Sequence, residues 1–301
     1  MAPSNTGISS GYDLNNDGRT VTEYPPPPPT RPDGSPGEQT AEGRAYGDDS
    51  FGFGTFPGQC AMGLLVRPGI KIERGEIRTF QEFLWKDMPG AALPENPETG
   101  EGWYTEEELE VFRLSSKSHW DVPVRVPGRG TVHLLASHPT PPTFDGEEDR
   151  NGRRNHDEIR FWGDYINGEP YIYDDGGGRG GLEDGESFVI LGDLNADPDE
   201  GDSFGNPIEI FLFANERVNG DFVPTARKPD PNLDPDDTAT FELRVDYVLP
   251  STDLALNGGE VFGHTALFGG ESPGDHFPVY TDLEVPKENP GKGPHEPRSR
   301  P

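Results

Sequence analysis

The chain has 301 residues, of which 55 are Asp or Glu and 25 are Lys or Arg, so its formal net charge is -30 and its pI is about 4.4. No stretch approaches the roughly 20 consecutive apolar residues that cross a bilayer, so we expect no membrane-spanning helix. The single cysteine, Cys60, excludes an internal disulfide scaffold.

The acidic residues are spread along the whole chain, and lysine is scarce. This distribution is typical of proteins solvated in molar salt, where charge repulsion is screened over roughly 3 Å. We therefore expect a halophilic source. An ordinary acidic protein with disordered ends would explain the two ends of the chain but not its acidic middle.

Two low-complexity segments divide the chain. Residues 24–43 contain five consecutive prolines, at positions 25–29, followed by polar residues, so we expect a disordered insertion there. Residues 286–301 are predicted to form a disordered tail. Residues 44–285 are long enough for one domain, to which residues 1–23 would contribute a loop segment.

No secretory signal is visible, so the sequence does not determine the compartment. An extracellular location would require a start further upstream.

The loop segment contains a partial calcium-binding pattern. Asp13, Asn15 and Asp17, followed by Gly18, match the first half of a calcium loop. Position 12 of such a loop should be Glu, but it is Tyr24 here, which excludes a full EF-hand. A shorter loop stabilised by Ca²⁺ and a plain polar turn both fit the pattern.

Strands and helices are predicted to interleave along the domain, which indicates an α/β or α+β class. A helix is expected over residues 155–166 with Asn155 as its cap, and another over 207–215 with Pro207 in the first position. Several apolar runs are continuous, which favours strands buried on both faces. The predicted strands are residues 61–66, 131–137, 187–192, 244–249 and 279–285.

The most specific chemical pattern follows the apolar run that ends at Leu191. Asp193 and Asn195 should emerge on the same face of that strand at its end, because side chains alternate along a strand. A carboxylate there can bind a hard cation or orient a water molecule, and the amide can donate to a phosphate oxygen. An Asx-rich turn that merely ends the strand fits the same residues.

Other polar residues stand at the ends of predicted strands. Asp246 lies within an otherwise apolar run and needs a partner if it is buried. His276 is a candidate partner, since a carboxylate can fix the tautomer of an imidazole and raise its pKa; a structural ion pair would look the same. His138 follows the run over residues 131–136, and a structural role fits it as well.

Taken together, the motifs resemble the endonuclease/exonuclease/phosphatase superfamily of DNase-like, metal-dependent phosphodiesterases. The resemblance implies an α+β fold, a four-layer α/β/β/α sandwich of two mixed sheets. The motifs appear in order over most of the chain: FGTFPGQ (53–59), LSSKSHWDVP (114–123), HPTPP (138–142), DGEEDRNGRRNHDEIR (145–160), GDLNADP (192–198), RVDYVLP (244–250) and GDH (274–276).

The resemblance also implies roles for individual residues. Asp193 would bind a metal ion, Mg²⁺ or Mn²⁺, or orient the attacking water, and Asp275 would help to hold the metal. His276, held by Asp246, would act as general base.

A second group of residues would contact the phosphate. Asn195 would hold it, and His138 would contact it or protonate the leaving oxygen. Arg153 and Arg154 could clamp it bidentately, although plain surface cations need no such function.

The resemblance breaks at the start of the chain. Members of the superfamily begin with a strand that carries Asn and a second strand that ends in a metal-binding Glu, whereas residues 5–11 resemble the loop after that Glu. The chain is therefore expected to lack two core strands, which would impair metal binding and expose sheet edges. A misplaced start codon, a separate chain that supplies the missing half, and a decaying gene all explain the difference.

Two functions remain. The first is a metal-dependent phosphoesterase that hydrolyses a phosphodiester, as a nuclease does, or a phosphomonoester by activated water. Its partner would be a nucleic acid or a small phosphoester, although an acidic chain without a basic stripe does not favour a long nucleic-acid groove. The second is a non-catalytic remnant or calcium-binding module of the same fold.

Overall fold

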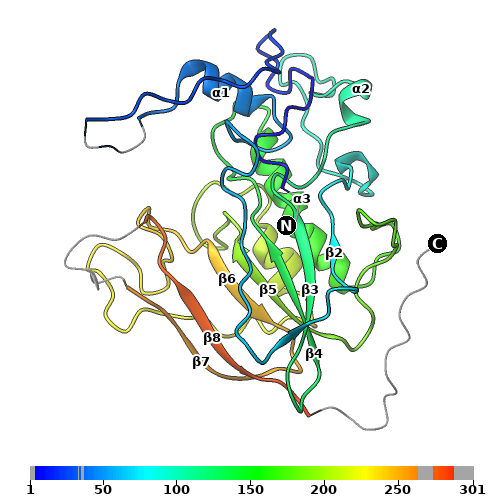
Figure 1. The fold of residues 1–301 in the computed structure, drawn as a ribbon, viewed down its shortest axis with the longest axis vertical. Helices are drawn as coiled ribbons and strands as arrows, with labels where there is room; N and C mark the ends of the chain where they lie inside the picture. Colours follow the sequence, from blue (N-terminus) through cyan, green and yellow to red (C-terminus); the bar gives the residue numbers. More distant parts are fainter. Residues whose placement is uncertain (1–3, 33, 35–36, 264–273, 288–301) are drawn as a thin grey trace.

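A central six-stranded mixed sheet dominates the structure, a computed structural model that describes residues 4–32, 34, 37–263 and 274–287 (Figure 1). Its order is β1-β3-β4-β5-β6, and β2 also pairs with β3. β4 and β5 are parallel, and the other neighbours are antiparallel. The strands are β1 (Lys71–Ile72), β2 (Arg78–Thr79), β3 (His119–Arg125), β4 (Thr131–Ser137), β5 (Ser187–Asp193) and β6 (Asp246–Pro250).

Both faces of the central sheet are apolar, which is why its strands have continuous rather than alternating hydrophobic sequences. Phe188 and Ile190 of β5 face the helix α3 (Arg150–Ile166), where they join the larger core cluster with Trp162. Val189, between them in sequence, faces the opposite way and packs with Val132. The sequence therefore predicted β4 over its full length and β5 to within one residue.

The second sheet is the antiparallel hairpin of β7 (Ala255–Val261) and β8 (Val279–Glu284). Leu283 points toward the central sheet, whereas Tyr280, Asp282 and Glu284 on the other face of β8 are exposed. The α+β class with two sheets is thus confirmed. The details differ from expectation, because within the described residues the second sheet is antiparallel rather than mixed and no helical layer covers this outer face of β8.

Helix α3 is longer than the sequence predicted. It begins at Arg150, after Asp149, which adopts a left-handed conformation with φ of 52°. Asn155 is therefore not the cap but an interior residue whose amide donates to the carbonyls of Thr140 and Leu194, at 2.8 and 2.9 Å. These two bonds tie the helix to the loops that follow β4 and β5.

Other predicted elements also need correction. Residues 61–66 form no strand: they run in extended form over the central sheet, where Met62, Leu64 and Val66 pack by their side chains. Pro207 is the N-cap, not the first residue, of a short π-helix, η2 (Ile208–Phe213). It packs against α3.

The remaining helices are short. α1 (Ala41–Asp48) begins inside the segment expected to be a disordered insertion, with Thr40 as its N-cap. The prolines before it have no helix or strand, and the predicted tail lies outside the described residues from position 288 onward. The others are η1 (Trp85–Asp87) and α2 (Glu106–Leu109). No helix in the described part of the chain is long and apolar enough to cross a membrane.

Candidate active site

Polar residues from four neighbouring strands meet at one edge of the central sheet. β4 and β5 are parallel and both end there, while β3 and β6 are antiparallel to them and begin there. This topology brings His138, just after β4, to the same edge as Asp193 and Asp246. Asp193 and Asp246 are directly opposite each other in the β5–β6 ladder, so the backbone register itself sets the two carboxylates side by side.

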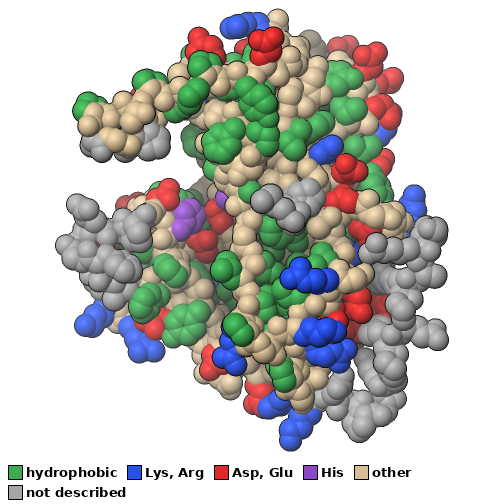
Figure 2. All heavy atoms as spheres, in the orientation of Figure 1, with side chains coloured by type: hydrophobic (Ala, Val, Ile, Leu, Met, Phe, Trp, Pro, Cys, Tyr) green, Lys and Arg blue, Asp and Glu red, His purple; other side chains and the backbone are tan. Residues whose placement is uncertain are grey.

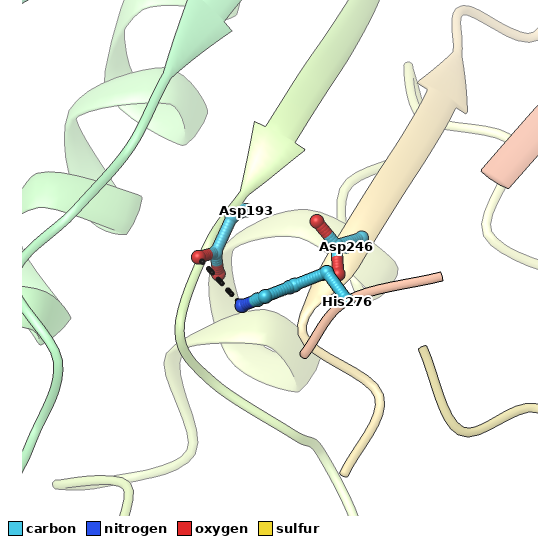
Figure 3. A group of neighbouring side chains, drawn as sticks. All are labelled: Asp193, Asp246 and His276. Carbon is cyan, nitrogen blue, oxygen red and sulfur yellow. Dashed lines mark hydrogen bonds and ion pairs between the residues drawn. The ribbon is translucent and has the colours of Figure 1, made fainter. Parts of the chain in front are cut away.

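His276 completes a cluster with these two carboxylates. One ligand atom from each of Asp193, Asp246 and His276 lies within 4.8 Å of the others (Figure 3). The short segment that carries His276 is anchored by an isolated bridge to Ala239 and by a 2.8 Å bond from the Thr240 amide to the Asp275 carbonyl. In Figure 2, histidine and acidic side chains gather in a hollow of the surface, beneath the projecting segment that leads into α1.

Asp246 and His276 form the pair that the sequence suggested. The His276 Nδ1 atom lies 2.7 Å from Asp246 Oδ2. This hydrogen bond is the main reason why the pKa of His276 is raised to about 9. Asp246 is fixed in turn by its own amide, which donates to Thr238 Oγ1 at 2.9 Å.

Asp193 is held at high electrostatic cost. Its pKa is raised to about 6, first because burial penalises the charged form and then because Asp246 is a neighbouring negative charge. The backbone N–H of Asn195, which has a φ of 52°, donates to Asp193 Oδ1 at 2.9 Å. Two carboxylates that repel each other at an open edge fit a hard divalent cation, which binds oxygen ligands and removes the repulsion.

Close backbone packing sets the position of Asp193. Gly192 has a φ of 142°, and a Cβ there would lie 2.0 Å from the carbonyl oxygen of Ser137. Glycine is therefore required before Asp193, because any larger residue would push β5 away from the end of β4.

His138 also reaches Asp193. Its Nε2 atom lies 3.3 Å from Asp193 Oδ2. The pKa of His138 is lowered to about 3, mainly by burial and further by the positive charges of Lys117 and His276. The imidazole is therefore neutral and offers one donor and one acceptor nitrogen.

Three other predicted site residues lie outside the cluster. Asp275 is exposed and is not one of the three clustered ligands. Arg154 is only 7% exposed and points into the interior, where it donates to the backbone carbonyls of Leu114, Phe51 and Arg113. It lacks the open position that a phosphate clamp requires.

Arg153 packs against an aromatic ring. Its guanidinium carbon lies 4.5 Å from the ring centroid of Phe204, a cation–π contact. Arg154 is used inside the fold and does not fit a bidentate clamp. Arg153, whose Nε atom is buried without a hydrogen-bond partner among the described residues, stays a predicted phosphate ligand.

The partial calcium loop folds on itself. Asp13 accepts from the amides of Asp17 and Gly18, at 3.1 and 2.8 Å, and Asn15 accepts from the Asp17 amide at 3.1 Å. These bonds are those of an Asx-type turn. Ca²⁺ binding by Asp13, Asn15 and Asp17 stays a prediction.

Sequence reasoning missed two residues at this edge. Thr238 anchors the start of β6 through its hydroxyl, which accepts from the amides of Val245 and Asp246. Lys117 lies just before β3 and donates to the Pro139 carbonyl at 3.2 Å. A lysine two residues before a buried strand, inside the SSKSHW motif, was the sequence signal for this residue.

One family model matches most of this chain. Residues 13–276 match the model of the Endonuclease/Exonuclease/phosphatase family, while no curated protein matches the chain. Among solved structures, the human nocturnin catalytic domain with bound sulfate is 12% identical, with a TM-score of 0.41, over 73% of this chain and 62% of that chain.

Two bacterial structures are also similar. An endonuclease/exonuclease/phosphatase from Beutenbergia cavernae is 22% identical, with a TM-score of 0.36, over 56% of this chain and 39% of that one. Sphingomyelinase C from Streptomyces griseocarneus is 15% identical, with a TM-score of 0.31, over 56% of this chain and 55% of that one. The chain thus covers less than two thirds of each of these structures. Because the matched segment spans most of its length, the chain belongs to the Endonuclease/Exonuclease/phosphatase family.

Proposed function

We propose that this protein is a metal-dependent hydrolase of phosphoester bonds. Members of the family are in general metal-dependent phosphoester hydrolases. The observation that supports the proposal most directly is the grouping of Asp193, Asp246 and His276 within 4.8 Å at the edge where the strand ends meet. A structural ion pair would not require a third charged group at an open edge.

Asp193 and Asp246 are the residues that would hold the cation, Mg²⁺ or Mn²⁺, because both ions accept carboxylate oxygens. When bound there, the cation would polarise a phosphoryl oxygen and offset the charge that develops on it. Asp275, which the sequence also suggested as a ligand, would need to turn toward the cluster to take part.

His276 would remove the proton from the attacking water. Because its Nδ1 atom is committed to Asp246, its Nε2 atom is the one that can accept a proton. With its pKa raised to about 9, the imidazole is mostly protonated at neutral pH, and it can act as a base only in its neutral form. It loses its own proton more readily once the neighbouring carboxylates are neutralised, since their charges are part of what raises that pKa.

Asn195 and His138 would face the phosphate. The Asn195 amide nitrogen donates one hydrogen to the Pro139 carbonyl at 3.1 Å, and its second hydrogen remains for a phosphate oxygen. His138, neutral and beside Asp193, could donate to the phosphate or to the leaving oxygen. Both phosphodiesters, as in a nuclease, and phosphomonoesters fit this arrangement.

Hydrolysis by the purified chain tests the proposal. Plasmid DNA, bis-p-nitrophenyl phosphate and p-nitrophenyl phosphate would be incubated in molar KCl, which screens the repulsion within so acidic a chain, with Mn²⁺ or Mg²⁺. We expect Asp193→Ala and His276→Ala to lose at least about 100-fold in rate, and Asp199→Ala, an exposed acid near the same loop, to keep the wild-type rate. Equal background rates for all four proteins would leave a non-catalytic module as the better explanation.

The same assay bears on the expected partner. A separate chain that supplies two further strands, and an activity impaired without them, stay predictions. Hydrolysis by this chain alone would make such a partner unnecessary.

A further inference from the structure

Lys117 lies at the same edge of the sheet as the candidate active site. It precedes β3, whose first residue is opposite Ser137 of β4. Its ammonium donates to the Pro139 carbonyl at 3.2 Å, and Asn195 donates to that same carbonyl at 3.1 Å. Lys117 and Asn195 therefore converge on one point beside the site.

The charge of Lys117 is poorly compensated. The residue is only 7% exposed, and burial lowers the pKa of its ammonium. An ammonium has three donor hydrogens, but the Pro139 carbonyl is its sole hydrogen-bond acceptor within the described residues. No ion pair within 4.0 Å joins it to a described carboxylate.

The nearest anions do not act as close partners. Glu158 attracts Lys117 at longer range, but its two carboxylate oxygens already accept from the Ser116 and Thr140 amides, at 2.7 and 2.6 Å. Asp193, the second attracting carboxylate, is among the clustered ligands. A buried cation without a close anion is costly unless a further partner arrives.

We propose that Lys117 is a phosphate-binding residue, whose buried ammonium takes an anionic oxygen of the substrate phosphoryl group as its missing partner. This inference rests on the proposed function. It also adds a phosphate-binding cation to those that the sequence suggested, of which Arg154 is committed to interior carbonyls and Arg153 stacks on Phe204. The lysine stem is flexible, so the ammonium can turn toward the hollow without movement of β3.

Binding of inorganic phosphate, with EDTA present and no hydrolysis involved, tests the inference. The dissociation constant would be measured by calorimetry at constant ionic strength for the wild type, Lys117→Met, Lys117→Arg and a control, Lys71→Met. Lys71 is an exposed lysine of β1, opposite Arg125 at the far end of β3. We expect Lys117→Met to bind phosphate at least about tenfold more weakly, and the control and Lys117→Arg to stay within a few-fold of the wild type.

Urea unfolding and steady-state kinetics complete the test. Lys117→Met should unfold at no lower urea concentration than the wild type, because it removes a poorly compensated charge, and should raise KM for bis-p-nitrophenyl phosphate more than it lowers kcat. Unchanged phosphate affinity in Lys117→Met, no phosphate binding by the wild type, or failure of Lys117→Met to fold would each overturn the inference. Phosphate binding through Lys117 without hydrolysis by the wild type would keep the inference and refute the proposed function.

Discussion

Replacing Asp193 by Asn should stabilise the protein while it abolishes hydrolysis. The pKa of Asp193 is raised from 3.8 to about 6 in the folded protein, a difference of about 2 units. One unit corresponds to about 1.4 kcal/mol, so the ionised carboxylate destabilises the fold by about 3 kcal/mol above pH 6. The side chain is 16% exposed, so solvent screening reduces this figure only moderately. Asn keeps an oxygen that can accept from the Asn195 amide.

The pH dependence gives the sign of the effect. Between the unfolded and folded pKa values the folded protein binds more protons than the unfolded chain, so the Asp193 contribution to stability falls as pH rises from about 4 to 6. We expect Asp193→Asn to be more stable than the wild type by up to about 3 kcal/mol at pH 8, and by about half of that at pH 5. Urea unfolding in EDTA measures both values, with Asp199→Asn as the control.

A lower stability of Asp193→Asn at pH 8, or the same difference at both pH values, would refute the electrostatic reasoning. Added Mn²⁺ gives a second readout. It should stabilise the wild type, whose two carboxylates can both act as ligands, and should stabilise Asp193→Asn much less.

Three further predictions follow from other contacts. His119 is 1% exposed and its pKa is lowered to about 4, so its contribution to stability is present above about pH 6.5 and is lost toward pH 4. Relative to His119→Gln, the wild type should lose about 2 kcal/mol between pH 8 and pH 5 in urea unfolding; parallel pH profiles would contradict this. Gly192→Ala should destabilise the protein by at least about 2 kcal/mol and lower the hydrolysis rate, because its Cβ would meet the Ser137 carbonyl; an unchanged melting temperature would argue against that close approach. If the loop of Asp13, Asn15 and Asp17 binds Ca²⁺, calorimetry should show a heat that Asp13→Ala removes, and no heat at millimolar Ca²⁺ would end the idea.

The sequence predicted the structure best where burial alone determines the hydrophobic pattern of a strand. β4 and β5 are buried on both faces, so their apolar runs coincide with the observed strands. The position of Asp193 at the end of β5 and its closeness to Asp246 follow from the same runs, once the strands are neighbours. The Asp246–His276 pair was predicted because a buried carboxylate needs a partner.

The errors have tertiary causes. Arg154 belongs to an Arg-Arg pair that looks like a surface cation pair, but the helix begins five residues earlier than expected, which turns this side chain toward interior carbonyls. Asn155 is of a residue type that often caps helices, but here its side chain lies within the helix and ties two loops to it. No local pattern distinguishes these uses, because each depends on segments that are distant in the sequence.

The extended run over residues 61–66 has a consequence for local opening. Its side chains pack on the central sheet, but Leu65 is 93% exposed and the run belongs to no strand ladder. Amide hydrogens there should exchange with solvent long before those of β4, although both segments border the same apolar cluster. Side-chain burial without backbone pairing thus leaves this run more open to proteolysis than β4, at a place whose composition suggests a protected strand.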